Sequence, residues 1–389
     1  MKRTKTPTPD LEELIPDLIS IWRKLRKESG PPDRLQTREF RGVVEAIKGL
    51  QAQSWKGQSL IGQDFFSDPE LLGAYLLYNW VIHYQEGLSL IGELPSPPRR
   101  VLDICSGPLP FAYAALKHGA REVIATDFNE NVLRYGAEIC GRGGYPVNIR
   151  KWNCLKDTPL PFEGKFDLII LGHCLQDLFP SSQKNWRTEQ ARFIQSRLNN
   201  LTPNGFLLIV DGSYPEANTR ILELRDQLVG QGVPVQAPCV WRGECVALRS
   251  QSYCFAQREL EKPHLIKEFQ RAAQINLSSL KMSYLLLRAP TAGWPHLPAK
   301  PLYRVISPPI ETIHGKRYYL CGTEGKKNIG SSVEPTPKDA RAFDFFRRGE
   351  LISYENVYER DTIVDLIDGS SITVEAPVGK PLPEEHYEN

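Results

Sequence analysis

The sequence lacks the long apolar segments of membrane proteins and the cysteine density of secreted ones. Its longest apolar run, LLGAYLLYNWVIHY, is broken by Asn79 and His83 and is too short to cross a bilayer. The first residues are briefly basic and then acidic, which is unlike a transit peptide. Eight cysteines in 389 residues, without a signal peptide, indicate a reducing compartment instead of a disulfide scaffold. We therefore expect a cytoplasmic protein that does not enter a membrane.

An excess of one charge and two nucleotide-binding motifs are also missing. The 48 basic and 46 acidic residues leave a net charge of +2, so any surface for nucleic acid must be local. The chain has no Gly-x-x-x-x-Gly-Lys, and only one of the three glycines of a dinucleotide fingerprint follows its first predicted strand. These absences count against a phosphate loop and against a dinucleotide site.

The patterns that are present divide the chain into four regions. Residues 1–95 are predicted to be helical, and LPSPPRR follows as a linker. Over residues 96–290, short apolar strands alternate with helices, which is typical of a parallel sheet covered on both faces. After the proline-rich junction APTAGWPHLPAKP, residues 291–378 contain short strands separated by Gly and Pro turns, which predicts a small OB-like β-barrel. Residues 379–389 are expected to form a disordered tail.

The first strand and turn of the alternating region contain a candidate cofactor site. Asp103 ends the predicted strand, and Gly107 lies in the turn that opens the next helix. In doubly wound folds, nucleotide-like ligands bind in the crevice at the carboxyl ends of the strands, and a residue without Cβ lets the backbone approach them. Asp127 ends the second strand, where a carboxylate can accept hydrogen bonds from ribose hydroxyls.

This arrangement resembles the class I S-adenosylmethionine methyltransferases. The resemblance implies an α/β fold with a Rossmann-like class I methyltransferase sheet, and S-adenosylmethionine as the cofactor. It places Asp103, Gly107 and Asp127 on the methionine and ribose side and Asn153 near the adenine. The family's Asp-x-Gly-x-Gly has Cys105 at its first glycine here. The alternative is a Rossmann-like domain that has lost the cofactor or binds another nucleotide.

The loop after the fourth predicted strand, LGHCLQDLFP, is where methyltransferases contact the methyl acceptor. It contains neither the Asn-Pro-Pro-aromatic motif for exocyclic amines nor a Pro-Cys nucleophile. His173 and Asp177 lie close enough along the chain to act as base and orienter. Alternatively, His173 packs only against the cofactor, because methyl transfer from a sulfonium depends mainly on alignment.

Three cysteines lie close together in residues 237–258, APCVWRGECVALRSQSYCFAQR. Buried free cysteine is the usual interpretation of an isolated thiol, but this segment has Pro and Gly punctuation and little amphipathic pattern. A metal site normally needs four ligands, and the natural fourth is Cys321 in the last region. The candidate metal ligands are Cys239, Cys245, Cys254 and Cys321.

These cysteines, with the later strand MSYLLLRA, resemble the methyltransferase-like family of mitochondrial-type small-ribosomal-subunit assembly. The family implies a [4Fe–4S] cluster on the four cysteines and binding to small-subunit ribosomal RNA or its precursor. Val240 and Trp241 stand where the family has Pro-His, and Phe255 and Ala256 replace His-Phe, so a mixed Cys/His site is not expected. Four thiolates also suit zinc, which remains the alternative metal.

The last region also has basic residues beside aromatic ones, in GKRYYLCGTEGKKN. Tyr318 is a candidate for stacking on a base, and four residues are candidates for phosphate contacts: Lys316, Arg317, Lys326 and Lys327. We therefore expect a methyltransferase that acts on or assembles with small-subunit ribosomal RNA. Two alternatives remain: a non-catalytic RNA-binding assembly factor, and a methyltransferase with structural zinc that acts on another substrate.

Overall fold

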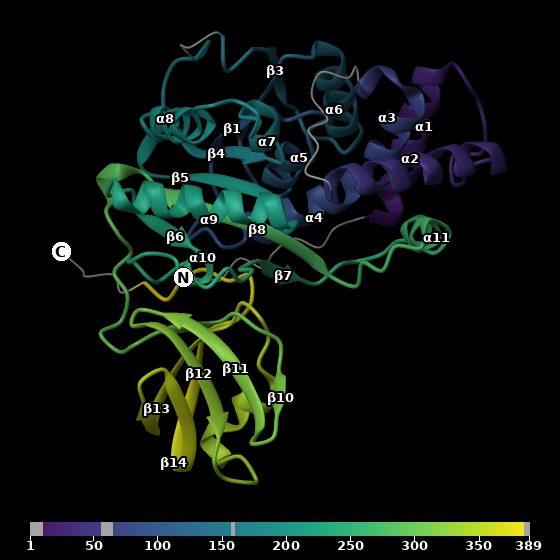
Figure 1. The fold of residues 1–389 in the computed structure, drawn as a ribbon. Helices are drawn as coiled ribbons and strands as arrows, with labels where there is room; N and C mark the ends of the chain where they lie inside the picture. The colour runs from purple at the N-terminus through teal and green to yellow at the C-terminus, as the bar shows by residue number, and fades with distance from the viewer. Residues whose placement is uncertain (1–10, 56–64, 157–159, 385–389) are drawn as a thin grey trace.

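The protein consists of a larger α/β body and a smaller β-barrel, which lies below the α/β body in Figure 1. The structure is a computed structural model that describes residues 11–55, 65–156 and 160–384. Among the described residues, no helix is long and apolar enough to cross a membrane.

The N-terminal region is helical, as predicted. Its elements are α1 (Leu11–Arg26), α2 (Thr37–Trp55), the 3-10 helix η1 (Phe65–Ser67), α3 (Pro69–Ala74), the π-helical segment η2 (Tyr75–Asn79) and α4 (Trp80–Ile91). Asp68 caps the start of α3, because its carboxylate accepts hydrogen bonds from the backbone N–H groups of Glu70 and Leu71. The helix then continues through one π-helical stretch into α4, and such π-bulges are frequent at functional sites.

The next region forms an eight-stranded sheet with the predicted Rossmann-like class I methyltransferase arrangement. Its strands are β1 (Arg100–Ile104), β2 (Glu122–Asp127), β3 (Asn148–Lys151), β4 (Phe166–Gly172), β5 (Leu201–Gly212), β6 (Val235–Ala237), β7 (Ala256–Arg258) and β8 (Leu280–Arg288). The order is β3-β2-β1-β4-β5-β8-β6, and β7 pairs with β8. β1 to β5 are parallel, whereas β8 is antiparallel to β5. The chain changes direction across the sheet between β1 and β4, which is the topological switch point where ligands bind in such folds.

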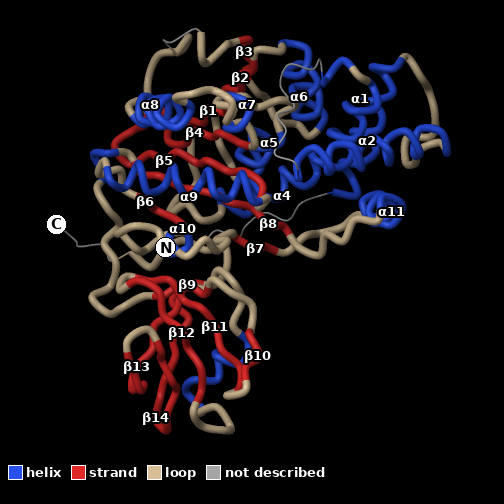
Figure 2. Tube along the Cα trace, in the orientation of Figure 1, coloured by secondary structure: helices blue, strands red, loops and turns tan. Residues whose placement is uncertain are grey.

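Helices cover both faces of this sheet, as Figure 2 shows in blue around the red strands. The helices of this region are α5 (Pro110–Lys117), α6 (Glu130–Arg142), α7 (Leu175–Leu178), α8 (Trp186–Leu198), α9 (Pro215–Gly230), α10 (Val246–Arg249) and α11 (His264–Ala273). Of these, α10 packs against α9 and α11 packs against α2. Along β1, Val101 packs into the core shared with the N-terminal helices and α5, while Leu102 packs into the core beneath α8 and α9. This alternation explains why the strand is apolar throughout.

The last region is a closed five-stranded barrel, which confirms the predicted OB-like fold. Its elements are the 3-10 helices η3 (Pro290–Ala292) and η4 (Lys338–Phe345) and the strands β9 (Tyr303–Val305), β10 (Ile310–Thr312), β11 (Gly315–Gly322), β12 (Gly325–Ser331), β13 (Leu351–Arg360) and β14 (Ile363–Ala376). The ring runs β9-β11-β12-β14-β13 and closes because β13 pairs with β9, while β10 extends β11 outside it. Among the described strands of the barrel, β12 and β14 pair in parallel and the other neighbours are antiparallel.

The two bodies meet beneath β6 and β7. Val240 packs in one apolar cluster with Leu302, Leu351 and Leu382. Residues 379–384 belong to the segment expected to be a disordered tail, yet Leu382 is buried and Glu384 accepts a hydrogen bond from Arg288 at 3.0 Å. The buried side chain of Leu382 and the ion pair between Glu384 and Arg288 therefore hold this part of the tail in place. Residues 385–389 lie outside the described chain.

Candidate functional site

The candidate cofactor crevice lies at the carboxyl ends of β1 and β2. Asp103 Oδ2 accepts the backbone N–H of Ala112 in α5 at 3.0 Å, whereas its Oδ1 is buried and has no hydrogen-bond donor. Burial raises the pKa of Asp103 well above its usual value. A buried carboxylate oxygen without a donor is costly, and a ligand with a positive charge or an N–H group would relieve that cost.

The loop after β1 is tied directly to the end of β2. Gly107 donates its N–H to Asp127 Oδ2 at 3.1 Å, and Asn129 donates to Asp127 Oδ1 at 2.9 Å. Gly107 has a φ of +52°, which is a left-handed conformation. A Cβ at this position would lie 3.8 Å from Phe66 Cζ and 3.8 Å from Tyr75 Oη, so the α-carbon of Gly107 faces the N-terminal helices.

The other predicted cofactor residues lie around the same crevice. Cys105 also has a left-handed φ, of +56°, and its sulfur lies 3.7 Å from the sulfur of Cys154. The Cys105 thiol packs against the core behind the loop. The contact with Cys105 and burial raise the pKa of Cys154. Asn153 uses its side-chain oxygen for its own turn, where it accepts the backbone N–H of Leu155 at 3.2 Å.

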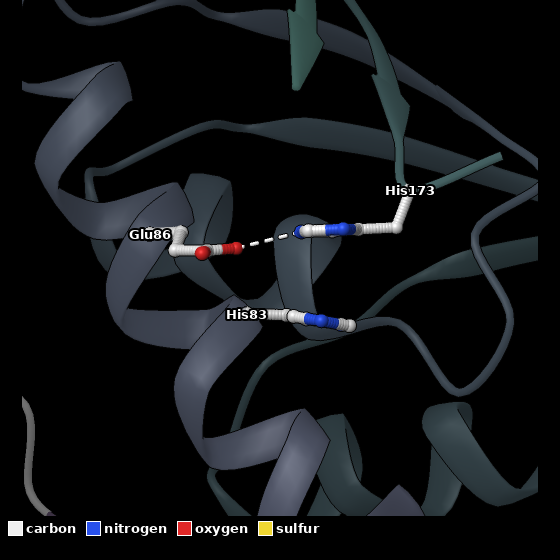
Figure 3. Close-up of side chains that lie close together, drawn as sticks. All are labelled: His83, Glu86 and His173. Atoms are coloured by element: carbon white, nitrogen blue, oxygen red, sulfur yellow. Dashed lines mark hydrogen bonds and ion pairs between the residues drawn. The ribbon is translucent and has the colours of Figure 1, made fainter. Parts of the chain in front are cut away.

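His173 follows β4 and lies in a cluster with side chains of α4, as Figure 3 shows. Its Nε2 is 2.7 Å from Glu86 Oε2, and its Nδ1 is 3.7 Å from Asp211 Oδ1 at the end of β5. Its ring stacks on His83, with centroids 3.9 Å apart and planes 12° apart. The polar contacts named here for His173 come from α4 and β5. The role predicted for Asp177, which lies half-buried on α7, stays a prediction.

The two stacked histidines have opposite electrostatic surroundings. Burial alone would lower the pKa of His173, but the Glu86 carboxylate outweighs it and holds this pKa above its usual value. Burial and the neighbouring His173 hold the pKa of His83 well below its usual value. Sequence reasoning missed His83, Glu86 and Asp211. The spacing of His83 and Glu86 on one helical face was the available signal.

The second candidate site is a cavity of about 60 Å³ between the two bodies. It is lined by the four predicted thiols: Cys239 after β6, Cys245 before α10, Cys254 before β7 and Cys321 on β11. Burial, and then the facing thiols of Cys239 and Cys245, raise the pKa of Cys321 to about 12. Residues far apart in sequence thus present four sulfurs to one space.

Arginine side chains surround this cavity. Arg225, Arg304 and Arg348 line it, and Arg304 Nε donates to the carbonyl oxygen of Pro238 at 2.7 Å across the junction. Arg225 donates to the carbonyl oxygens of Gly243 and Trp241, and so holds the loop between Cys239 and Cys245. Nε and Nη1 of Arg348 are buried without a hydrogen-bond partner. Buried guanidinium groups need negative partners, which deprotonated thiols bound to a metal would supply.

The spacing of the sulfurs bears on which metal fits the cavity. In the part of the chain that the structure describes, no three of these sulfurs lie within 4.8 Å of one another. A tetrahedral zinc site with Zn–S bonds of about 2.3 Å would bring its sulfurs to roughly 3.8 Å. In every set of three of these thiols, at least one pair of sulfurs is therefore farther apart than in such a zinc site.

The prediction that Tyr318 stacks on a base is wrong. Tyr318 is 2% exposed and packs edge-on against Phe343 and Phe346, so it cannot stack on a base. Side chains alternate along β11, and the exposed tyrosine is therefore Tyr319. The Lys326 ammonium lies 4.4 Å from the centre of its ring.

Three of the four predicted basic residues have partners within the barrel. Arg317 forms an ion pair with Asp365 at 2.7 Å, and Lys327 forms one with Glu359. Lys316 donates to the carbonyl oxygen of Asp344 at 3.2 Å. Lys326 is thus the predicted basic residue that lies beside an exposed aromatic ring.

A family model described as "Mitochondrial small ribosomal subunit Rsm22" matches residues 95–334, more than half of the chain. The chain belongs to the Rsm22 family. The match to the Rsm22 model includes the candidate cofactor residues from Asp103 to Asn153 and all four cysteines of the cavity between the bodies.

Parts of this Rsm22-family chain are also similar to methyltransferases. The ribosomal protein L11 methyltransferase of Lactobacillus delbrueckii subsp. bulgaricus is 32% identical over 126 residues, which cover 30% of this chain and 39% of that protein. The protein of the same name from Geobacter sulfurreducens is 34% identical over 94 residues, which cover 24% of this chain and 28% of that protein. The chain thus spans less than half of the length of these curated relatives. A SAM-dependent methyltransferase structure from Aquifex aeolicus is 16% identical and covers 54% of this chain and 91% of that one, with a TM-score of 0.34.

Proposed function

We propose that this chain is an S-adenosylmethionine-dependent methyltransferase that acts on or assembles with small-subunit ribosomal RNA. The observation that carries the proposal is the crevice beside the switch point of the sheet. There, Asp103 has a buried oxygen without a donor, and the backbone of Gly107 is held against Asp127. A ligand that carries a cationic amine and ribose hydroxyls matches these groups.

In this proposal, each predicted crevice residue holds one part of the cofactor. Asp103 would accept a hydrogen bond from the α-amino group. Asp127 would accept hydrogen bonds from the ribose hydroxyls through the lone pairs that its two backbone donors leave free. Asn153 would lie beside the adenine. Cys105 would be tolerated in place of glycine because its sulfur is turned toward Cys154.

The cofactor, when bound, supplies a methyl group on a sulfonium. The chain's own task is to align the acceptor and to exclude water from it. His173, with Asp177 as orienter, is the catalytic group proposed from the sequence, and Glu86 now adds the hydrogen bond that fixes the ring.

We further propose that Cys239, Cys245, Cys254 and Cys321 hold a [4Fe–4S] cluster, with zinc as the alternative. Support comes from the shared cavity, the wide spacing of the sulfurs and the unpartnered buried nitrogens of Arg348. Because Cys321 belongs to the barrel, such a cluster would hold the barrel against the methyltransferase sheet.

The proposed RNA partner is supported by the family match and by the exposed Tyr319–Lys326 pair on the barrel. The strands of OB-like barrels commonly present stacking side chains to nucleic acid. We propose the cytoplasm as the compartment, because all eight cysteines are free and thiols persist in a reducing environment.

A second candidate is a non-catalytic RNA-binding assembly factor. The observation that favours it is Cys105, which stands at the first glycine of the class I methyltransferase motif. A third is a methyltransferase with structural zinc and another substrate. Calorimetry with S-adenosylmethionine separates the first two: we expect binding that Asp127→Ala weakens at least tenfold, while the exposed barrel variant Asp368→Ala leaves it unchanged. If the cofactor does not bind while RNA does, the chain is an assembly factor.

A further inference from the structure

The stacked pair His83–His173 lies between the cofactor loop and the end of β4. Tyr75, in the π-helical segment, connects the two places: its Oη lies 3.8 Å from the Cβ position of Gly107 and 3.4 Å from His83 Nδ1. Phe111 lies beside both imidazoles, with its ring centroid 6.3 Å from that of His83 and 6.1 Å from that of His173. The side chain of His173 is 20% exposed, so this cluster can be reached from solvent.

A metal ion does not explain this cluster. Nitrogen and oxygen atoms of His83, Glu86 and His173 do lie within 4.8 Å of one another. However, imidazoles bind a metal along lone pairs in the ring plane, and the two planes are only 12° from parallel (Figure 3). The lone pairs therefore run side by side and do not meet at one ion.

The hydrogen bonds give the two rings different roles. Glu86, from α4, accepts a hydrogen bond from Nε2 of His173, and Asp211, from β5, faces Nδ1, so His173 lies between two carboxylates. His83 has no carboxylate partner: its Nδ1 contacts Tyr75, and its Nε2 has no hydrogen-bond partner among the described residues. When the surroundings of two neighbouring titratable groups move their pKa values in opposite directions, one group can serve as acid and the other as base.

We propose that His83, in place of the His173 that the sequence suggested, is the proton acceptor of the methyl-transfer site and that His173, held by Glu86, is its cationic partner. The inference rests on the proposed function, and it names the acceptor as a nitrogen that carries hydrogen. In the tautomer that donates Nδ1–H to the Tyr75 oxygen, the lone pair of His83 is on Nε2.

The step balances in atoms and charge. The bond between sulfur and the methyl carbon breaks, the bond between the acceptor nitrogen and that carbon forms, and the sulfonium becomes a neutral thioether. The acceptor nitrogen gains the positive charge and then gives its proton to Nε2 of His83. His83 can accept this proton despite its low pKa, because the methylated nitrogen of an aromatic amine holds its proton weakly. Stacking on cationic His173 then favours release of that proton before the next turnover.

The first test needs no substrate. Protein labelled with ¹⁵N in its seven histidines is titrated by NMR, with His83→Gln and His173→Gln used to assign the two ring signals. We expect His83 to titrate below 6.5 and His173 above it, and Glu86→Gln to move His173 downward. Two ordinary titrations near 6.5 would overturn the inference. The groups that face the pair are Tyr75 beside His83, Glu86 and Asp211 beside His173, and Phe111 beside both rings.

The second test measures methyl transfer from labelled S-adenosylmethionine to small-subunit ribosomal RNA. His83→Gln should slow transfer by roughly 10²–10⁴-fold, while cofactor affinity by calorimetry stays that of the wild type. The exposed His314→Gln is the matched control. Undiminished transfer by His83→Gln overturns the inference and leaves the proposed function standing, whereas a wild type that binds no cofactor removes the proposed function itself.

Discussion

The replacement Gly107→Ala tests the proposed cofactor binding separately from the stability of the fold. The Cβ would meet Phe66 and Tyr75 at 3.8 Å, which is an ordinary contact distance, so the folded protein has room for the methyl group. The remaining cost is that of alanine at a φ of +52°, about 1–2 kcal/mol. For a body of this size, a loss of 1 kcal/mol lowers the melting temperature by about 2–4 °C.

The same methyl group should also weaken cofactor binding, because it projects into the space between the loop and the N-terminal helices. We expect S-adenosylmethionine affinity to fall at least tenfold, or about 1.4 kcal/mol. Gly144→Ala is the control, since Gly144 has a φ of +77° and nothing within 4 Å of its Cβ position. It lies at the far end of α6, on the order of 20 Å from the crevice.

The assay is therefore calorimetry with S-adenosylmethionine, read beside thermal melting of both variants. Similar losses of stability with a loss of binding in Gly107→Ala alone would support the account. Wild-type affinity in Gly107→Ala, or equal loss of affinity in both variants, would refute the placement of the cofactor at this loop.

Four other predictions concern the thiol cavity, the barrel and the histidine pair. Cys321→Ser should abolish metal retention, whereas Cys140→Ala, buried in α6 away from the cavity, should retain it; equal metal content in both proteins refutes a site shared by the two bodies. Tyr319→Ala should weaken RNA binding without a change in melting temperature, and binding that ignores salt counts against phosphate contacts. Tyr318→Ala should instead cost about 3–5 kcal/mol of barrel stability, measured by chemical unfolding, because it empties a buried aromatic site. Because the pKa of His173 is raised in the folded state, this residue contributes fully to the free energy of unfolding below pH 6.5, and the contribution is lost as the pH rises through the folded-state pKa. His173→Gln should therefore lower the melting temperature more at acidic than at alkaline pH. The opposite order would contradict the pairing with Glu86.

The sheet and the barrel could be predicted because their signals are local. Continuous apolar strands such as FDLIILG alternate with helices, and Gly and Pro turns separate the short strands after Ala289. The four thiols were also accessible from sequence, because cysteines outside an amphipathic pattern stand out even when they are 67 residues apart, as are Cys254 and Cys321.

The histidine cluster could not be found in this way. Glu86 and His173 are 87 residues apart, and each lies in an unremarkable local pattern. Only the packing of α4 across the end of β4 brings them together. The choice of Tyr318 over Tyr319 failed for another reason: adjacent residues of a strand face opposite sides, and the sequence YY does not reveal which side is buried.

The central claim is that two bodies of one chain close a single metal centre with four thiolates. It is tested most directly by purifying the full chain without oxygen and measuring iron, acid-labile sulfide, zinc and the visible spectrum. The account predicts a brown protein with iron and sulfide in equal amounts. A colourless protein with one zinc per chain would contradict the cluster, and a protein with no metal would contradict the site.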